Sequence, residues 1–314
     1  MDSFGRSGSG REHGSPVPSE GAAEAVRILS KFAAADGRSV AVRTLRGPRF
    51  EFFARGDIER PAASVLKMAI VMTAYDLAAK GLLDLDESIE HAELGHSIYP
   101  SVLEVFSGDH RFTLREVGGL ALALSDNLSA NYLLHVVGLE EVAGFIDAIG
   151  CRATHLRVGY GDPELGPRGR ANVSTAEDVL RMLEYLYSSV PGSPVLRAME
   201  NGARKSRIAL RLPEDLPIAN KTGSLEGVCN DAALIRGEAL DLAFVALTDR
   251  EADTAVTGME IGDAASGVWH ALGGRMEEKE LFAAPPALAN VGVRSETREI
   301  AHRIWRLKKN RRFN

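Results

Sequence analysis

The sequence has few of the features that mark disulfide-rich, membrane or nucleic-acid-binding proteins. It contains two cysteines, Cys151 and Cys229, which lie far apart without CxxC spacing, so we expect free buried thiols. No apolar run approaches the roughly 20 residues that a membrane-spanning helix needs. A net charge of -6 gives no reason to expect nucleic acid or an anionic membrane as partner of the whole chain. These absences leave an ordinary soluble globular protein.

Metal and secretion signals are also missing. The eight histidines show no HExxH or similar spacing, so we predict neither a metal site nor a cofactor. Residues 1–23 are rich in Gly, Ser and Pro and lack an apolar block, which indicates a disordered leader and not a secretory signal. As coded, the chain is expected in the cytoplasm, and outside it only if the true start lies upstream.

Periodicity divides the remaining chain into three parts. After a helix that ends near Gly37, two strands are predicted at Ser39–Leu45 and Phe50–Arg55. Nearly every segment from 62 to 211 has a helical pattern, and one of these helices opens with Ser174 and Glu177 at capping-box spacing. Three further strands, LPIANKTGS, CNDAALIRG and DLAFVALTD, precede a last helix.

Strands at both ends of the chain predict one antiparallel sheet built from distant segments. The expected fold class is α+β in three layers, with helices flanking the sheet and an all-helical second lobe. We assign 24–61 and 212–274 to the sheet lobe and 62–211 to the helical lobe, within one domain spanning 24–274. A crevice between the lobes is the expected small-molecule site.

Three short motifs carry the chemistry. Ser64 and Lys67 form SxxK, the SDN motif starts 61 residues later at Ser125, and KTGS starts a further 96 residues on at Lys221. Each motif alone is weak, because SxxK fits a solvated helix face, SDN a helix cap and KTG a turn. Their combination in this order is specific.

The set resembles the serine β-lactamase and penicillin-binding-protein superfamily, with spacings most similar to class A β-lactamases. The resemblance covers roughly 24–274. It implies a serine hydrolase that forms an acyl-enzyme on Ser64 and hydrolyses the β-lactam amide of penicillins and cephalosporins. Two alternatives stay open: a D,D-peptidase or esterase on the same scaffold, and a β-lactam- or peptidoglycan-binding protein without turnover.

A serine hydroxyl is a poor nucleophile until a neighbouring base accepts its proton. Lys67 can be that base if burial and a second cation, Lys221, depress its pKa. The resemblance implies that Ser125 relays a proton to the departing lactam nitrogen, with Lys221 behind it.

The resemblance also implies the substrate contacts. Asn127 would bind the side-chain amide of the substrate, while Thr222 and Ser224 would hold its carboxylate. The oxyanion hole would be formed by the backbone N–H groups of Ser64 and Ser224. Gly223 would let the substrate approach the strand closely.

Two further residues have alternative interpretations. Tyr99 lies where class A enzymes carry an aromatic wall of the site, but it also fits a rim or core tyrosine. Arg207 lies where some members place a second carboxylate anchor, but it also fits a surface arginine.

One loop departs from the class A pattern. There, Glu-x-x-Leu-Asn holds the water that releases the acyl group, whereas this chain has DPEL followed by Gly166. In that register Asp162 replaces the glutamate, but the loop is shorter than usual, and the longer side chain of Glu164 is favoured slightly as the group that serves the water. Without the asparagine we predict slow deacylation.

The segment 275–314 extends beyond the resemblance. Ile300, Ile304 and Leu307 form an apolar stripe on a predicted helix with a strongly basic end. This helix could dock on the acidic body, an anionic membrane surface or a partner, and its partner is unknown from the sequence.

Overall fold

The computed structural model describes residues 20–161, 171–189 and 193–275, all within one structural unit that ends at Met276. The predictions for residues 1–19 of the N-terminal leader, for the C-terminal basic helix and for Asp162, Glu164 and Gly166 therefore lie outside the described residues. Residues 20–23, which we had also assigned to the leader, instead begin the first helix, Glu20–Phe32.

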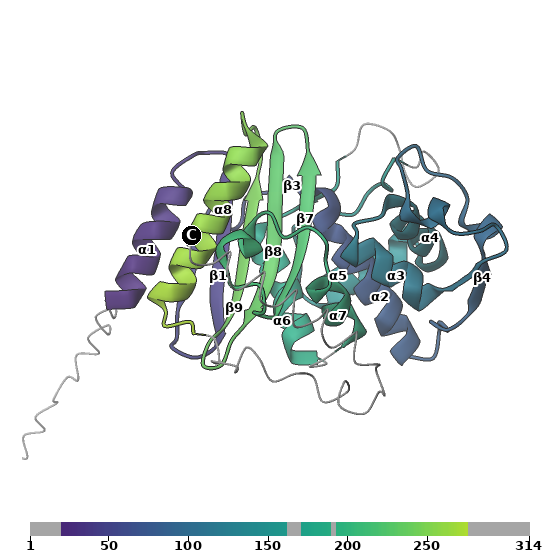
Figure 1. Cartoon of the computed structure of the whole chain (residues 1–314), viewed down its shortest axis with the longest axis horizontal. Helices are drawn as coiled ribbons and strands as arrows, with labels where there is room; N and C mark the ends of the chain where they lie inside the picture. Colours follow the sequence, from purple (N-terminus) through teal and green to yellow (C-terminus); the bar gives the residue numbers. More distant parts are fainter. Residues whose placement is uncertain (1–19, 162–170, 190–192, 276–314) are drawn as a thin grey trace, which may run out of the picture. The chain divides into compact units, whose positions relative to one another are not determined.

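In the described part of the chain, five strands form one antiparallel sheet in the order β2-β1-β9-β8-β7 (Figure 1). The strands are β1 (Arg38–Arg46), β2 (Glu51–Ala54), β7 (Ile218–Leu225), β8 (Val228–Arg236) and β9 (Asp241–Thr248). The first strand pairs with the last, and Val40 lies opposite Ala246. The predicted sheet from both ends of the chain is confirmed.

Each face of the sheet has its own apolar core. Helices α1 (Glu20–Phe32) and α8 (Thr254–Ala271) cover one face, and α6 (Ala176–Ser189) contacts β1 and β9 from the other (Figure 1). Side chains alternate between the two cores along each strand, as the pleat requires. Phe244 packs with Trp269 in the first core, and its neighbour Val245 packs with the helical lobe in the second.

The helical lobe lies beside the sheet, on the side away from α1 and α8 (Figure 1). Its longer elements are α2 (Lys67–Ala79), α3 (Leu114–Ala123), α4 (Asn127–Val137), α5 (Leu139–Ala148) and α7 (Pro194–Glu200). The short helical turns are η1 (Ala63–Leu66), η2 (His91–Leu94), η3 (Val102–Val105) and η4 (Ile208–Arg211). Within α2, all residues from Lys67 to Ala74 are buried, so this helix runs through the core of the lobe.

The sequence pattern predicted an all-helical lobe, and the structure differs from this prediction. Two small ribbons interrupt the lobe, β3 (Arg60–Pro61) with β6 (Val173–Ser174) and β4 (Ser88–Glu90) with β5 (Arg111–Thr113). Strands of two or three residues are too short to show a period of two. The predicted cap of α6 is wrong by one residue, because the Asp178 N–H donates to Thr175 Oγ1 at 3.1 Å and Ser174 belongs to β6.

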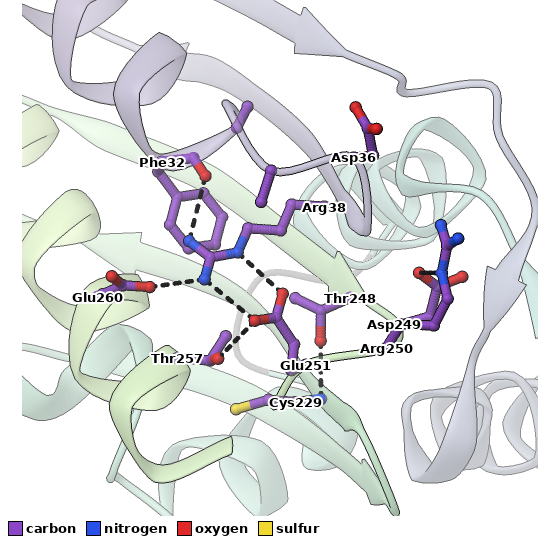
Figure 2. A network of polar contacts seen from close by, with 12 residues as sticks. Phe32, Asp36, Arg38, Cys229, Thr248, Asp249, Arg250, Glu251, Thr257 and Glu260 are labelled. Carbon is purple, nitrogen blue, oxygen red and sulfur yellow. Dashed lines mark hydrogen bonds and ion pairs between the residues drawn. The ribbon is translucent and has the colours of Figure 1, made fainter. Parts of the chain in front are cut away.

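A polar network ties the N-terminal segment to the last helix (Figure 2). Arg38 donates to both carboxylate oxygens of Glu251, at 2.8 and 3.0 Å, and pairs with Glu260 at 2.7 Å. Thr257 Oγ1 donates to Glu251 at 2.8 Å. This network fixes β1 against α8, and nearby Cys229 is buried without a bridge, as predicted; Cys151 is also a free buried thiol.

None of the helices in the described ranges combines the length and apolarity needed to cross a bilayer.

Candidate active site

Ser64 lies on η1, a 3-10 turn, and the α-helix begins only at Lys67. The two residues are therefore not on one continuous α-helix, although a 3-10 turn also brings positions i and i+3 to one side. The residue before Ser64, Ala63, has a φ of +49°, a conformation that side chains disfavour and that functional sites often retain.

Gly223 allows strand β7 to pack directly against the turn that carries Ser64. A Cβ atom at position 223 would lie 2.8 Å from the carbonyl oxygen of Ala62 and 3.1 Å from the Cβ of Ala63. From the neighbouring strand, Asn230 Nδ2 donates to the Pro61 carbonyl at 2.7 Å. The nucleophile turn is thus held against the edge of the sheet, with the Gly223 backbone in close contact.

Lys67 is fully buried and points at the SDN loop. Its Nζ donates to the Ser125 carbonyl at 2.6 Å, to Asn127 Oδ1 at 2.6 Å and to the Asp126 carbonyl at 3.2 Å. Burial lowers the pKa of Lys67 to about 7; the charge of Asp126 opposes this effect and that of Arg204 adds to it. A substantial fraction of the amine is neutral at physiological pH.

Lys221 reaches the same loop from strand β7. Its Nζ donates to Ser125 Oγ at 2.8 Å and to the Thr222 carbonyl at 2.9 Å. Burial, followed by the charge of Lys67, holds the pKa of Lys221 well below its usual range, while buried Asp231 acts in the opposite direction. The Nζ atoms of two lysines therefore converge on Ser125.

The SDN loop is held by its aspartate. Asp126 caps α4, with Oδ1 accepting from the Ser129 N–H at 2.8 Å. Its Oδ2 accepts from the Val102 N–H at 3.0 Å, so Asp126 has a structural role in this loop. Ser125 has a φ of +59°, and this sharp turn directs its carbonyl to one lysine and its hydroxyl to the other.

Arg207 is anchored beside the end of strand β7. Its guanidinium donates to the carbonyl of Gly223 at 2.7 Å, to the carbonyl of Asn230 and to Ser224 Oγ. The side chain is half-buried at the end of the KTGS strand, where Thr222 is buried and Ser224 is exposed. Arg207 therefore adds a positive charge next to the predicted carboxylate-binding hydroxyl of Ser224.

A cavity of about 410 Å³ opens in front of Ser64, within the range of small-molecule sites. It is lined by Ala63, Ser64, Tyr99, Asn127, Val158, Gly159, Tyr160, Gly161, Ala171, Asn172, Ser224 and Leu225. Tyr99 is 48% exposed and forms part of the rim. A second cavity of about 10 Å³, the size of one water, is lined in part by Ser125, Lys221, Thr222 and Arg204.

Four residues at the site were not identified from the sequence. Tyr160 and Asn172 line the larger cavity, Asn131 bonds the backbone of Tyr160, and Arg204 lies near both lysines. Asn131 follows Asn127 by one helical turn, so the spacing offered a signal. No local motif or spacing indicated Tyr160, Asn172 or Arg204.

The comparisons with known proteins bear on the family and the fold. The model of the Beta-lactamase enzyme family matches residues 22–272. The fold is similar to the β-lactamase of Sphaerobacter thermophilus, with 23% identity over 80% of this chain and 97% of that chain and a TM-score of 0.70. The β-lactamase of Chitinophaga pinensis gives 23% identity, coverages of 79% and 98% and a TM-score of 0.70.

PBP-A is also similar, at 18% identity over 79% of this chain and 95% of that chain, with a TM-score of 0.68. No curated protein matches. At these identities the solved structures show the fold, and the family model shows the membership. The resemblance inferred from the three motifs is confirmed: the chain belongs to the β-lactamase enzyme family.

Proposed function

We propose that the protein is a serine hydrolase that opens β-lactam rings through an acyl-enzyme on Ser64. The observation that carries this proposal is the convergence of Lys67 and Lys221 on Ser125, beside a cavity that Ser64 lines. A structural role for two buried ammonium groups is a weak explanation, because desolvation of each is costly.

In acylation, Ser64 Oγ attacks the lactam carbonyl carbon while the neutral amine of Lys67 accepts the hydroxyl proton. A neutral amine has two N–H donors and a lone pair. Its two shorter bonds, at 2.6 Å to Ser125 and Asn127, use the donors. The longer bond to the Asp126 carbonyl, at 3.2 Å, is given up in the neutral form, which leaves the lone pair for that proton. When the C–N bond breaks, the nitrogen takes the proton of Ser125 Oγ, and Lys221 replaces it along the hydrogen bond that it donates to this oxygen.

Substrate binding follows from the charges around the cavity. Lys221 and Arg207 flank the Thr222–Ser224 segment and favour a carboxylate beside the scissile ring. Asn127 Oδ1 accepts from Lys67, so its Nδ2 group is the part of the side chain available to a substrate carbonyl. The expected substrate is a small anionic lactam or a peptidoglycan-like peptide.

Release of the acyl group is expected to be the slower step of the reaction. None of the described residues that line the cavity is acidic. Asp162 and Glu164, the predicted bases for water, follow Gly161 outside the described ranges. With Gly166 in place of the water-holding asparagine, we expect acylation to be faster than deacylation. This expectation also favours a second candidate, a D,D-peptidase or esterase with a long-lived β-lactam adduct.

Intact-mass spectrometry over time after mixing with a penicillin tests the proposal. We expect an adduct that forms and then decays, and that is absent in Ser64→Ala. Ser188→Ala, which changes an exposed serine of α6, is the matched control and should form the adduct normally. A permanent adduct would indicate a binding protein, and no adduct in the wild-type protein would contradict the proposal.

A further inference from the structure

Tyr160 contacts the catalytic lysine but has no part in the proposed chemistry. The Nζ of Lys67 lies 4.5 Å from the centroid of the Tyr160 ring, within the range of a cation–π interaction. The ring also lines the cavity that Ser64 faces. The ring is therefore a further contact of the ammonium, in addition to its three hydrogen bonds to the SDN motif.

The backbone of Tyr160 is held by one buried amide. The Tyr160 N–H donates to Asn131 Oδ1 at 2.8 Å, and Asn131 Nδ2 donates to the Tyr160 carbonyl at 3.2 Å. Asn131 lies on α4 one turn after Asn127, whose side chain accepts from Lys67. One face of α4 thus fixes both the ammonium group and the aromatic ring that contacts it.

The hydroxyl of Tyr160 does not explain this placement. It is buried and has no hydrogen-bond partner among the described residues. Burial raises the pKa of Tyr160, so the phenol stays neutral and cannot serve as a base near neutral pH. An unpaired buried hydroxyl is a cost to the fold, so the benefit must come from the ring.

We propose that Tyr160 is a positioning residue whose ring face holds the protonated Nζ of Lys67 against Ser125 and Asn127. The proposal rests on the function given above, because it assigns Lys67 the role of base. The charges that act on Lys67 are those of Asp126, which favours its protonated form, and Arg204, which opposes it. Lys221 reaches the same loop, and its own pKa is lowered by the charge of Lys67. The ring is thus an uncharged group that favours the protonated lysine, and it limits how far burial and Arg204 lower the pKa of Lys67.

The test is the titration of Lys67 itself, followed by NMR of lysine labelled with ¹³C at Cε, without substrate. The resonance is assigned by its loss in Lys67→Met, and exposed Lys80 serves as an internal control. Tyr160→Leu, which removes the aromatic face, should lower the titration midpoint of Lys67 by about half to one pH unit. Tyr160→Phe, which removes only the unpaired hydroxyl, should leave it in place.

A graded series keeps the test valid if Tyr160→Leu does not fold. Phenylalanine analogues with one to three ring fluorines, introduced at position 160, weaken the ring quadrupole with little change of volume. The midpoint should fall with each fluorine, and the acidic limb of the pH profile of acylation should move with it.

An unchanged midpoint in Tyr160→Leu and across the fluorinated series would overturn the proposal. An equal shift in Tyr160→Phe would assign the effect to the hydroxyl and would also overturn it. Failure of the wild-type protein to form a penicillin adduct would instead contradict the proposed function, because the titration uses no substrate.

Discussion

Lys221 Nζ and Ser125 Oγ are 2.8 Å apart although they are separated by 96 residues. The lysine belongs to the edge strand of the sheet and the serine to the loop before α4 in the helical lobe. This contact crosses the junction of the two lobes, so the geometry of the site depends on how strand β7 packs on the helical lobe.

Lys67→Met should reduce the rate of acylation about 10²- to 10⁴-fold, the usual contribution of a positioned general base. Methionine preserves the volume and the packing of α2 but cannot accept the Ser64 proton. The rate is measured from the adduct mass or from a chromogenic cephalosporin. Lys80→Met, at the exposed end of the same helix, is the control, and acylation by Lys67→Met at the wild-type rate would exclude Lys67 as the base.

Acylation should also depend on pH through the same group. Only the neutral amine accepts a proton, and burial sets the pKa of Lys67 to about 7. The rate of acylation should therefore be nearly constant above pH 8 and fall about tenfold per pH unit well below pH 7. A profile that is flat between pH 5 and pH 8 would contradict this assignment.

The free energy of unfolding should also depend on pH through Lys67. The folded-state pKa of Lys67, about 7, lies below its ordinary value of 10.5, so the unfolded chain binds more protons between these two values. Stability contributed by this residue therefore rises with pH in that window. Relative to Lys67→Met, the wild-type protein should gain about 2 kcal/mol between pH 7 and pH 9, measured by urea unfolding. Loss of the Lys67 charge also raises the pKa of Lys221, which increases the difference in the same direction. A constant difference would refute the prediction.

Gly223→Ala should destabilise the fold by about 1–3 kcal/mol and slow acylation, because the new methyl group would meet the Ala62 carbonyl at 2.8 Å. Gly144→Ala is a suitable control, since no atom lies within 4 Å of a Cβ at this position in α5. That change should be neutral or stabilising by up to about 1 kcal/mol. Thermal unfolding and adduct formation measure both effects, and equal behaviour of the two variants would rule out tight packing at Gly223.

Glu164→Gln should leave acylation intact and lengthen the lifetime of the adduct, if this carboxylate activates the water. Asp162→Asn is the parallel variant. The lifetime is followed by intact mass after removal of free penicillin. An unchanged lifetime in Glu164→Gln with a longer one in Asp162→Asn would assign the role to Asp162, and no change in either would leave the base elsewhere.

Much of the fold followed from local patterns. The strands of the sheet alternate or form short apolar runs bounded by Gly and Pro, so their existence and their shared sheet were predicted. The two small ribbons were missed because two or three residues carry no periodicity. The cap of α6 was misplaced because Ser174 and Thr175 are equally suitable cap residues, and only the pairing of β6 with β3 distinguishes them.

The sequence by itself determined the reactive groups, their order along the chain and the protein's family. Residue types and their spacing can be read directly from the sequence. The tertiary structure decided the environment of those groups. Burial lowers the pKa values of Lys67 and Lys221, and Asn131 sets the ring of Tyr160 against Lys67. Such effects arise from contacts between segments remote in the chain, and spacing along the sequence does not encode them.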